Sequence, residues 1–223
     1  HFGKHHDVEI KRNTKAILLD VDSRCVVLES GGKRERLSFD KLIYAGGARS
    51  KTLDIAGLYG PRVVNFRSFN DLSAIKKALI DGARRAVVVG CGYYGIEAAL
   101  KLKAAHLMVT VIESKRHIMQ RFSLQFSQWM VQKLSELDIA VLLGENIRSV
   151  EELPGYRFKL DLASGHKTEC DLVVVAIGIE PNVSLLAESG AALDPEGLIR
   201  VDNKMATTLP NVYACGSAVS VPI

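Results

Sequence analysis

The sequence predicts an α/β protein built around a parallel β-sheet, and three observations carry this prediction. Short, almost wholly apolar segments recur at 86–89, 108–112 and 172–177, which is the composition of strands buried on both faces. Segments with helical spacing of apolar residues separate the first strands, and a glycine-rich loop at 90–95 follows the first of them. Such alternation of strand and helix is typical of a parallel sheet, so we expect one with helices on both faces and an added β-meander.

The composition is that of an ordinary folded protein and excludes several classes. Of 223 residues, 48% are hydrophobic and 24% charged, which excludes disordered, collagen-like and coiled-coil chains. No apolar run approaches the roughly 18 residues of a membrane-spanning helix, so we expect no membrane partner. The 29 Lys and Arg nearly balance 25 Asp and Glu, and adjacent cation pairs are spread along the chain. We therefore expect no nucleic-acid partner.

The first 83 residues read as strands followed by a linker. Apolar and β-branched segments predict short strands, with a turn at Gly31-Gly32, and 51–70 reads as a loop. Asn70 or Asp71 can cap a helix that runs to about Ile80. Such a meander is not a complete domain. The strands are expected at 8–10, 15–20, 24–28, 33–37 and 41–45.

The remainder of the chain contains the strand–helix alternation and a return to shorter elements. Apolar stripes predict helices at 96–105 and 123–137, and a hairpin is expected to precede the strand that ends at Ile177. Other elements are expected at 139–143, 184–188, 198–201 and 211–216.

Cysteine and histidine positions favour structural roles. The four cysteines form no CxxC pair and have no zinc spacing, which is typical of buried thiols in a reducing, cytoplasmic location. His1, His5 and His6 have a spacing that could hold a metal on a helix, but an exposed terminus is the simpler interpretation. We expect no metal. The cysteines are Cys25, Cys91, Cys170 and Cys215.

The glycine loop matches the requirements of a dinucleotide-binding fingerprint. It follows an apolar strand and opens a helix, and each glycine has a physical task. Gly90 makes the tight turn, Gly92 lets the backbone approach a pyrophosphate, and Gly95 lets the helix pack on the strand. The helix N-terminus offers free N–H groups to phosphates. The loop therefore predicts a Rossmann-like domain that binds NAD(H) or NADP(H).

The residues after the next strand bear on which nucleotide binds. Glu113 lies at the strand end, where a carboxylate accepts hydrogen bonds from the adenine-ribose hydroxyls and favours NAD(H) over NADP(H). Lys115 and Arg116 follow it and could meet a 2′-phosphate, so the preference stays open.

With these residues in view, the chain resembles the pyridine nucleotide-disulfide oxidoreductases, in the branch of coenzyme A-disulfide reductase and NADH oxidase. The resemblance rests on the GCGYYGIE run and on three further segments. It implies that Tyr93 and Tyr94 lie at the cofactor, that Tyr93 gates the nicotinamide pocket, and that Glu97 lies near nicotinamide and flavin. The three segments are 42–49 and 174–182, similar to the family's two "ATG"-type crossings, and 207–219, similar to its late flavin motif.

The same resemblance implies further cofactor residues and two departures. The backbone of Ile177 and Gly178 would run beside the bound nicotinamide nucleotide. The residues of the two flavin-related segments would face FAD. Ser217 stands where the family has an Asp, and Gly46 where Thr is usual, so the flavin site looks incomplete while the nicotinamide site looks whole. The implied flavin-facing residues are Ala45, Gly46, Gly47, Gly216 and Ser217.

The motif order predicts a piece of a larger enzyme. Residues 1–83 are expected to be part of an FAD domain, 84–204 an NAD(P)H-binding domain inserted into it, and 205–223 the return segment. The family's first FAD fingerprint, redox cysteine and dimerisation domain do not appear, so no catalytic residue is named and a homodimer is expected of the intact protein only.

The predicted function is hydride transfer from NAD(P)H to FAD and on to a disulfide, oxygen, peroxide or redox-protein acceptor. The alternative is a nucleotide-binding module without redox activity that senses NAD(H) or borrows a flavin site from a partner.

Overall fold

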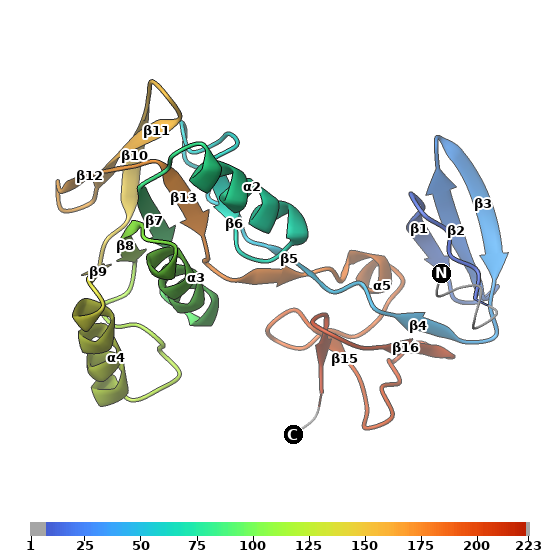
Figure 1. Ribbon diagram of the computed structural model, residues 1–223. Coiled ribbons are helices and arrows are strands. Elements are labelled where there is room, and N and C mark those ends of the chain that lie inside the picture. Colours follow the sequence, from blue (N-terminus) through green and yellow to red (C-terminus); the bar gives the residue numbers. More distant parts are fainter. Residues whose placement is uncertain (1–7, 222–223) are drawn as a thin grey trace. The chain divides into compact units, whose positions relative to one another are not determined.

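The computed structural model describes residues 8–221, which form two compact units (Figure 1). One unit comprises residues 50–179, and the other comprises the chain on either side of it, described over 8–49 and 180–221. His1, His5 and His6, considered above for a metal, lie outside the described residues. Within 8–221, no helix is long and apolar enough to cross a membrane.

The central unit is built on a five-stranded sheet in which every neighbouring pair is parallel, which confirms the α/β class. The strand order is β6-β13-β7-β8-β9. The edge strand β6 falls inside the segment expected to be a loop. It has only three residues, too few to give a strand pattern in the sequence, and it forms by pairing with β13. The strands are β6 (Val63–Asn65), β7 (Arg85–Val89), β8 (Met108–Glu113), β9 (Ile139–Leu143) and β13 (Leu172–Val175).

The helices α2, α3 and α4 connect consecutive strands of this sheet and pack on one of its faces. A single core cluster contains residues of each helix together with alternate strand residues such as Val88 and Val174. The first helix begins after Ser68, whose hydroxyl accepts from the Asp71 N–H while the Asp71 carboxylate accepts from the Ser68 N–H. The helices are α2 (Phe69–Ile80), α3 (Tyr93–Ala104) and α4 (Leu124–Glu136).

The opposite face is covered by an antiparallel meander, which corrects the expectation of helices on both faces. Val87 and Val89 alternate with the helix-facing residues and pack against Phe158 and Leu160 of the meander. After β9 the chain returns as strands rather than as a helix, so the second layer is a sheet. The meander consists of β10 (Ile147–Leu153), β11 (Arg157–Leu162) and β12 (Lys167–Cys170).

The other unit combines an antiparallel sheet with two parallel strand pairs around its own core. Leu186 and Ile199 are fully buried there beside Leu19 and Val212. Residues 8–10, expected to be a strand, are irregular. The antiparallel sheet is β1 (Lys15–Asp20), β2 (Cys25–Ser30) and β3 (Lys33–Ser38). The pairs are β4 (Leu42–Tyr44) with β16 (Val212–Ala214) and β15 (Ile199–Arg200) with β17 (Val219–Ser220), and α5 is Ser184–Glu188.

The unit boundaries lie elsewhere than expected. The chain passes between the units through the paired strands β5 (Ala48–Ser50) and β14 (Ile179–Pro181), and not at 83/84 and 204/205. The physical reason is packing: β6 and α2 complete the sheet and core of the central unit. Residues 180–204 supply Leu186 and Ile199 to the core of the other unit.

Candidate nucleotide-binding site

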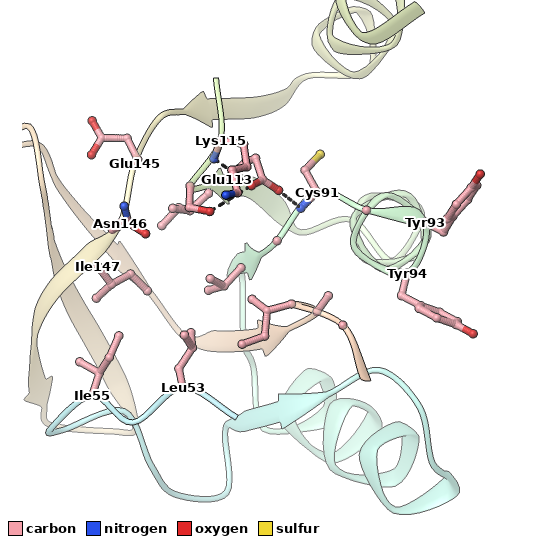
Figure 2. Close-up of a pocket in the computed structure, with 18 residues that line it drawn as sticks. Leu53, Ile55, Cys91, Tyr93, Tyr94, Glu113, Lys115, Glu145, Asn146 and Ile147 are labelled. Atoms are coloured by element: carbon pink, nitrogen blue, oxygen red, sulfur yellow. Dashed lines mark hydrogen bonds between the residues drawn. The ribbon is translucent and has the colours of Figure 1, made fainter. Parts of the chain in front are cut away.

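A cavity of about 670 Å³ opens at the carboxyl ends of β7, β8 and β13 in the central unit (Figure 2). Crevices at this edge of an open parallel sheet are the usual ligand sites of such folds, and this volume suits a small molecule or cofactor. Of the residues singled out in the sequence, the cavity is lined by Gly90, Gly92, Tyr93, Tyr94, Glu113, Lys115, Ile177 and Gly178.

The glycine loop turns sharply under steric constraint. Gly90 has φ +99°, which L side chains rarely adopt, and its N–H donates to the Ile112 carbonyl at 2.8 Å. A Cβ on Gly95 would run into the Gly90 carbonyl oxygen, so the helix and the strand approach as closely as the backbone allows. Gly95 is buried and does not line the cavity. Its task of close packing matches the sequence interpretation.

Helix α3 begins at Tyr93, one turn earlier than expected, with Gly92 as its N-cap. Gly92 can start the helix because its extended conformation exposes the next N–H groups. Among the described residues, none accepts a hydrogen bond from the N–H of Gly92, Tyr93 or Tyr94. A Cβ on Gly92 would meet no atom within 4 Å. The open helix N-terminus thus presents unpaired donors and a partial positive charge at the cavity.

Glu113 is fixed at the carboxyl end of β8 by backbone donors. One carboxylate oxygen accepts from the Cys91 N–H at 2.7 Å, and the other accepts from the Lys115 N–H at 2.9 Å and the Ser114 hydroxyl at 3.3 Å (Figure 2). Each carboxylate oxygen has two lone pairs, so the oxygen that accepts only from Cys91 retains capacity for one more donor. The anion is therefore held in one orientation at the wall of the cavity.

Two buried thiols are kept protonated by their surroundings. Burial, and next the Glu113 carboxylate, raise the pKa of Cys91 to about 12, and burial with the Asp171 charge raises that of Cys170 to about 12. A thiol with such a pKa is not a nucleophile at neutral pH. The buried state of Cys25, Cys91 and Cys170 agrees with their interpretation as core residues, whereas Cys215 is half-buried.

Apolar residues from distant segments form another wall, and sequence reasoning missed them. Leu53 and Ile55 come from the loop before β6, and Ile147 begins the meander (Figure 2). Glu145 and Asn146 add polar groups beside Ile147. No local motif marks these positions. The nearest signal was the apolar alternation of Leu53 and Ile55 in a segment rich in loop residues.

The remaining candidates lie outside this cavity. Glu97 is exposed on α3 and Arg116 is exposed after β8, and neither lines it. The five flavin-facing candidates belong to the other unit. They are Ala45, Gly46, Gly47, Gly216 and Ser217.

The other unit brings these five residues to neighbouring strand ends. Strands β4 and β16 pair in parallel with Ala214 opposite Tyr44, so both loops leave from the same edge. The Cys215 N–H donates to the Tyr44 carbonyl at 3.0 Å. Asn182 fastens the first loop, since its side-chain amide donates to the Gly46 carbonyl at 2.8 Å. The two loops therefore leave neighbouring strand ends in this unit.

Comparisons with known proteins agree with this architecture. Rubredoxin-NAD(+) reductase of Pseudomonas putida is 30% identical over 96% of this chain and 54% of its own length. Apoptosis-inducing factor 3 of Homo sapiens is 30% identical over 100% of this chain and 36% of its own length. A solved NAD-dependent persulfide reductase from A. fulgidus has a TM-score of 0.91 at 29% identity, over 98% of this chain and 40% of that one.

The chain thus spans between about a third and somewhat over half of the length of these relatives. The family described as pyridine nucleotide-disulphide oxidoreductase matches residues 3–222, almost the entire sequence. By fold, cavity position and sequence, the chain belongs to the pyridine nucleotide-disulphide oxidoreductase family.

Proposed function

We propose that this chain supplies the NADH-binding part of an FAD-dependent oxidoreductase. The observation that carries the proposal is the composition of the cavity. It combines the open N-terminus of α3, free space in front of Gly92, and the fixed carboxylate of Glu113. These groups fit a dinucleotide: the N–H groups of Gly92, Tyr93 and Tyr94 suit the pyrophosphate, and the apolar wall suits a base.

The preference for NADH over NADPH rests on Glu113. Its carboxylate is held at the cavity wall and retains one lone pair for a ribose hydroxyl, whereas a 2′-phosphate at the same place would meet a like charge. Lys115 lines the cavity, and its positive charge would favour a 2′-phosphate and hence NADPH. Arg116 does not line the cavity. Two of the relatives described above carry NAD in their names, which supports the same preference.

The chain's own residues position the nucleotide for transfer. The chain leaves β13 at Val175, and the backbone of Ile177 and Gly178 then lines the same cavity as Tyr94. Gly178 has φ +108°, so the chain turns away and leaves space beside the cofactor. FAD, when bound, supplies the acceptor for the hydride of NADH. The loops after β4 and β16 would hold FAD through their glycine backbone, and Ser217 stands there in place of the family's Asp.

The direct test of the nicotinamide site is titration of the 223-residue chain with NADH and NADPH by calorimetry. Gly92→Ala is the matched variant, because its Cβ meets nothing in the free protein yet would stand where the pyrophosphate approaches. We expect the Kd for NADH to rise by about tenfold or more, with the thermal unfolding midpoint unchanged. Equal NADH binding by Gly92→Ala and the parent chain would contradict this site.

The flavin part is tested on the natural full-length protein. We expect it to purify with bound FAD whose visible absorbance is bleached by NADH in the absence of oxygen. A colourless protein that takes up no FAD but still binds NADH would overturn the redox function. Such a protein would be a nicotinamide nucleotide-binding module, the reading that Ser217 favours.

A further inference from the structure

The excess positive charge of the chain is concentrated in one segment of the central unit. Residues 114–135 contain no Asp or Glu but four cations, and the chain's formal net charge is also +4. Without these four, the 29 Lys and Arg fall to 25 and balance the 25 Asp and Glu. The cations are Lys115, Arg116, Arg121 and Lys133. The spread of cation pairs along the sequence therefore conceals a clustered excess.

Three of these cations have no acidic partner among the described residues. Lys115, Arg116 and Arg121 are exposed, and no ion pair joins any of them to a carboxylate within residues 8–221. Lys133, by contrast, pairs with Glu136 at 2.7 Å. Exposed positive charges that have no acidic partner are available to bind an anionic surface.

A row of aromatic rings lies in the same segment. Phe122 and Phe126 lie 4.8 Å apart between ring centroids, Trp129 follows at 5.8 Å from Phe126, and Tyr93 meets Phe122 at 6.2 Å. Trp129 is 50% exposed and Leu124 is 54% exposed, which is high for large apolar side chains. We call Phe122, Leu124 and Trp129 with Arg116 and Arg121 the aromatic–basic patch, and Lys115 is left out because it lines the nucleotide cavity.

The loop that carries part of the patch is tied to α4 by a buried hydrogen bond. Ile118 is buried, and its N–H donates to the buried Ser127 hydroxyl at 3.0 Å, which ties the loop to α4. In Figure 1 the loop after β8 and α4 lie at the outer edge of the central unit. Ordering the patch on binding therefore costs little entropy.

We propose that the aromatic–basic patch docks this protein on the surface of a bilayer rich in anionic lipids. Amphipathic elements that carry Lys and Arg beside Trp, Phe and Leu lie in the headgroup region of such membranes. Each basic residue adds about 1 kcal/mol, or about fivefold in affinity, near an anionic leaflet. Peripheral docking needs no membrane-spanning helix.

The geometry favours a lipid surface over the two other anionic occupants. Nucleic-acid bases stack on free ring faces, but Phe126 is flanked by Phe122 and Trp129 in tilted contacts. Acidic protein surfaces are matched by interfaces of mixed polarity with a charge-poor centre, whereas residues 114–135 hold one sign of charge throughout. A uniformly anionic, deformable layer matches both features.

Trp129 is the only tryptophan in the sequence, so its fluorescence reports on the patch directly. The 223-residue chain is mixed with vesicles of phosphatidylcholine alone or of phosphatidylcholine with phosphatidylglycerol, and binding is measured by co-sedimentation and Trp emission. We expect a blue shift and sedimentation with the anionic vesicles only, decreasing as salt is raised. Absence of binding, or equal binding to neutral vesicles, overturns the proposal.

A pair of double variants separates the patch from net charge. Arg116→Gln/Arg121→Gln should weaken binding to the anionic vesicles by about 25-fold. Arg148→Gln/Arg200→Gln removes the same charge from two exposed positions outside the patch and should change it less than about twofold. Equal weakening by both variants would overturn the patch assignment. So would tighter binding to a poly-dT oligonucleotide, or to poly-glutamate, than to the anionic vesicles.

Discussion

The two ends of the central parallel sheet are built in opposite ways. At the amino ends, Asp171 accepts from the N–H groups of Arg84 and Arg85 at 2.9 Å each and pairs with the Arg85 guanidinium at 3.3 Å. The nearly buried Arg62 donates to the Asp171 carbonyl at 3.4 Å and lies over the Tyr156 ring at 5.6 Å. At the carboxyl ends, the N–H groups of Gly92, Tyr93 and Tyr94 lack partners among the described residues.

This difference separates stability from binding along one set of strands. At the amino ends the donors of Arg62, Arg84 and Arg85 meet acceptors of Asp171, so these polar groups stabilise the fold. At the carboxyl ends, donors and space are left for a ligand, at a cost in stability that the closed end offsets. Variants at the two ends should therefore separate into loss of fold and loss of binding.

The largest effect is expected at Gly95, where the open end itself depends on close packing. In Gly95→Ala the new Cβ would overlap the Gly90 carbonyl oxygen, so the helix and the strand must separate. We expect the free energy of unfolding to fall by more than about 3 kcal/mol. Urea denaturation measures it, and Gly92→Ala is the control on the same loop. A loss as small as that of the control would contradict the packing role.

The next effect is expected at the closed end. Asp171→Ala leaves the N–H groups of Arg84 and Arg85 without their buried acceptor, which costs about 2–3 kcal/mol of stability. NADH binding by the folded fraction should remain within about twofold of the parent chain, because the cavity is at the other end. Calorimetric titration below the unfolding midpoint checks this. A selective loss of NADH affinity would break the separation of the two ends.

The Asp171 carboxylate should also contribute to the pH dependence of stability. Burial raises the pKa of Asp171, but the N–H groups of Arg84 and Arg85 and the Arg85 guanidinium outweigh it, so its pKa lies below the usual value. Its stabilisation is therefore complete above the unfolded pKa of about 3.9 and is lost as pH falls through the folded value. Asp171→Asn should flatten this acid limb in thermal unfolding. An unchanged limb would assign it to other carboxylates.

A smaller effect confined to binding is expected at Glu113. Glu113→Gln keeps the shape and one acceptor but loses the charge, so we expect NADH affinity to fall by about tenfold and the ratio of NADPH to NADH affinity to rise. Calorimetric titration with both nucleotides measures this. A parallel loss for NADH and NADPH would mean that Glu113 only orders the loop through the Cys91 N–H.

The smallest effect is expected at Arg116, which follows Glu113 in the sequence but lies outside the cavity. Arg116→Gln should change NADH affinity by less than about twofold. Stopped-flow or equilibrium titration detects a larger change, which would show that the Arg116 side chain reaches the nucleotide.

The sequence predicted what depends on neighbouring residues. The strands β7, β8 and β13, the tight turn at Gly90 and the contact at Gly95 follow from local composition and spacing. Helix α3 begins one turn before the expected Ile96 because Gly92 provides the N-cap. Ahead of β13 the sequence predicted a hairpin, where the structure has the three-stranded meander β10-β11-β12. It did not predict which face of the sheet this layer covers, because a pattern shows that a side chain is buried and not what buries it.

Only the tertiary structure decided which distant segments meet. It paired Val63–Asn65 with Leu172–Val175, and it brought Leu53 and Ile147 to the wall of one cavity. It also placed the unit boundaries at the crossings of β5 and β14. Parallel pairing joins segments far apart in the chain through backbone hydrogen bonds that any residue except proline can make. The sequence therefore determined the chemistry of the glycine loop, and long-range pairing determined the cavity around it.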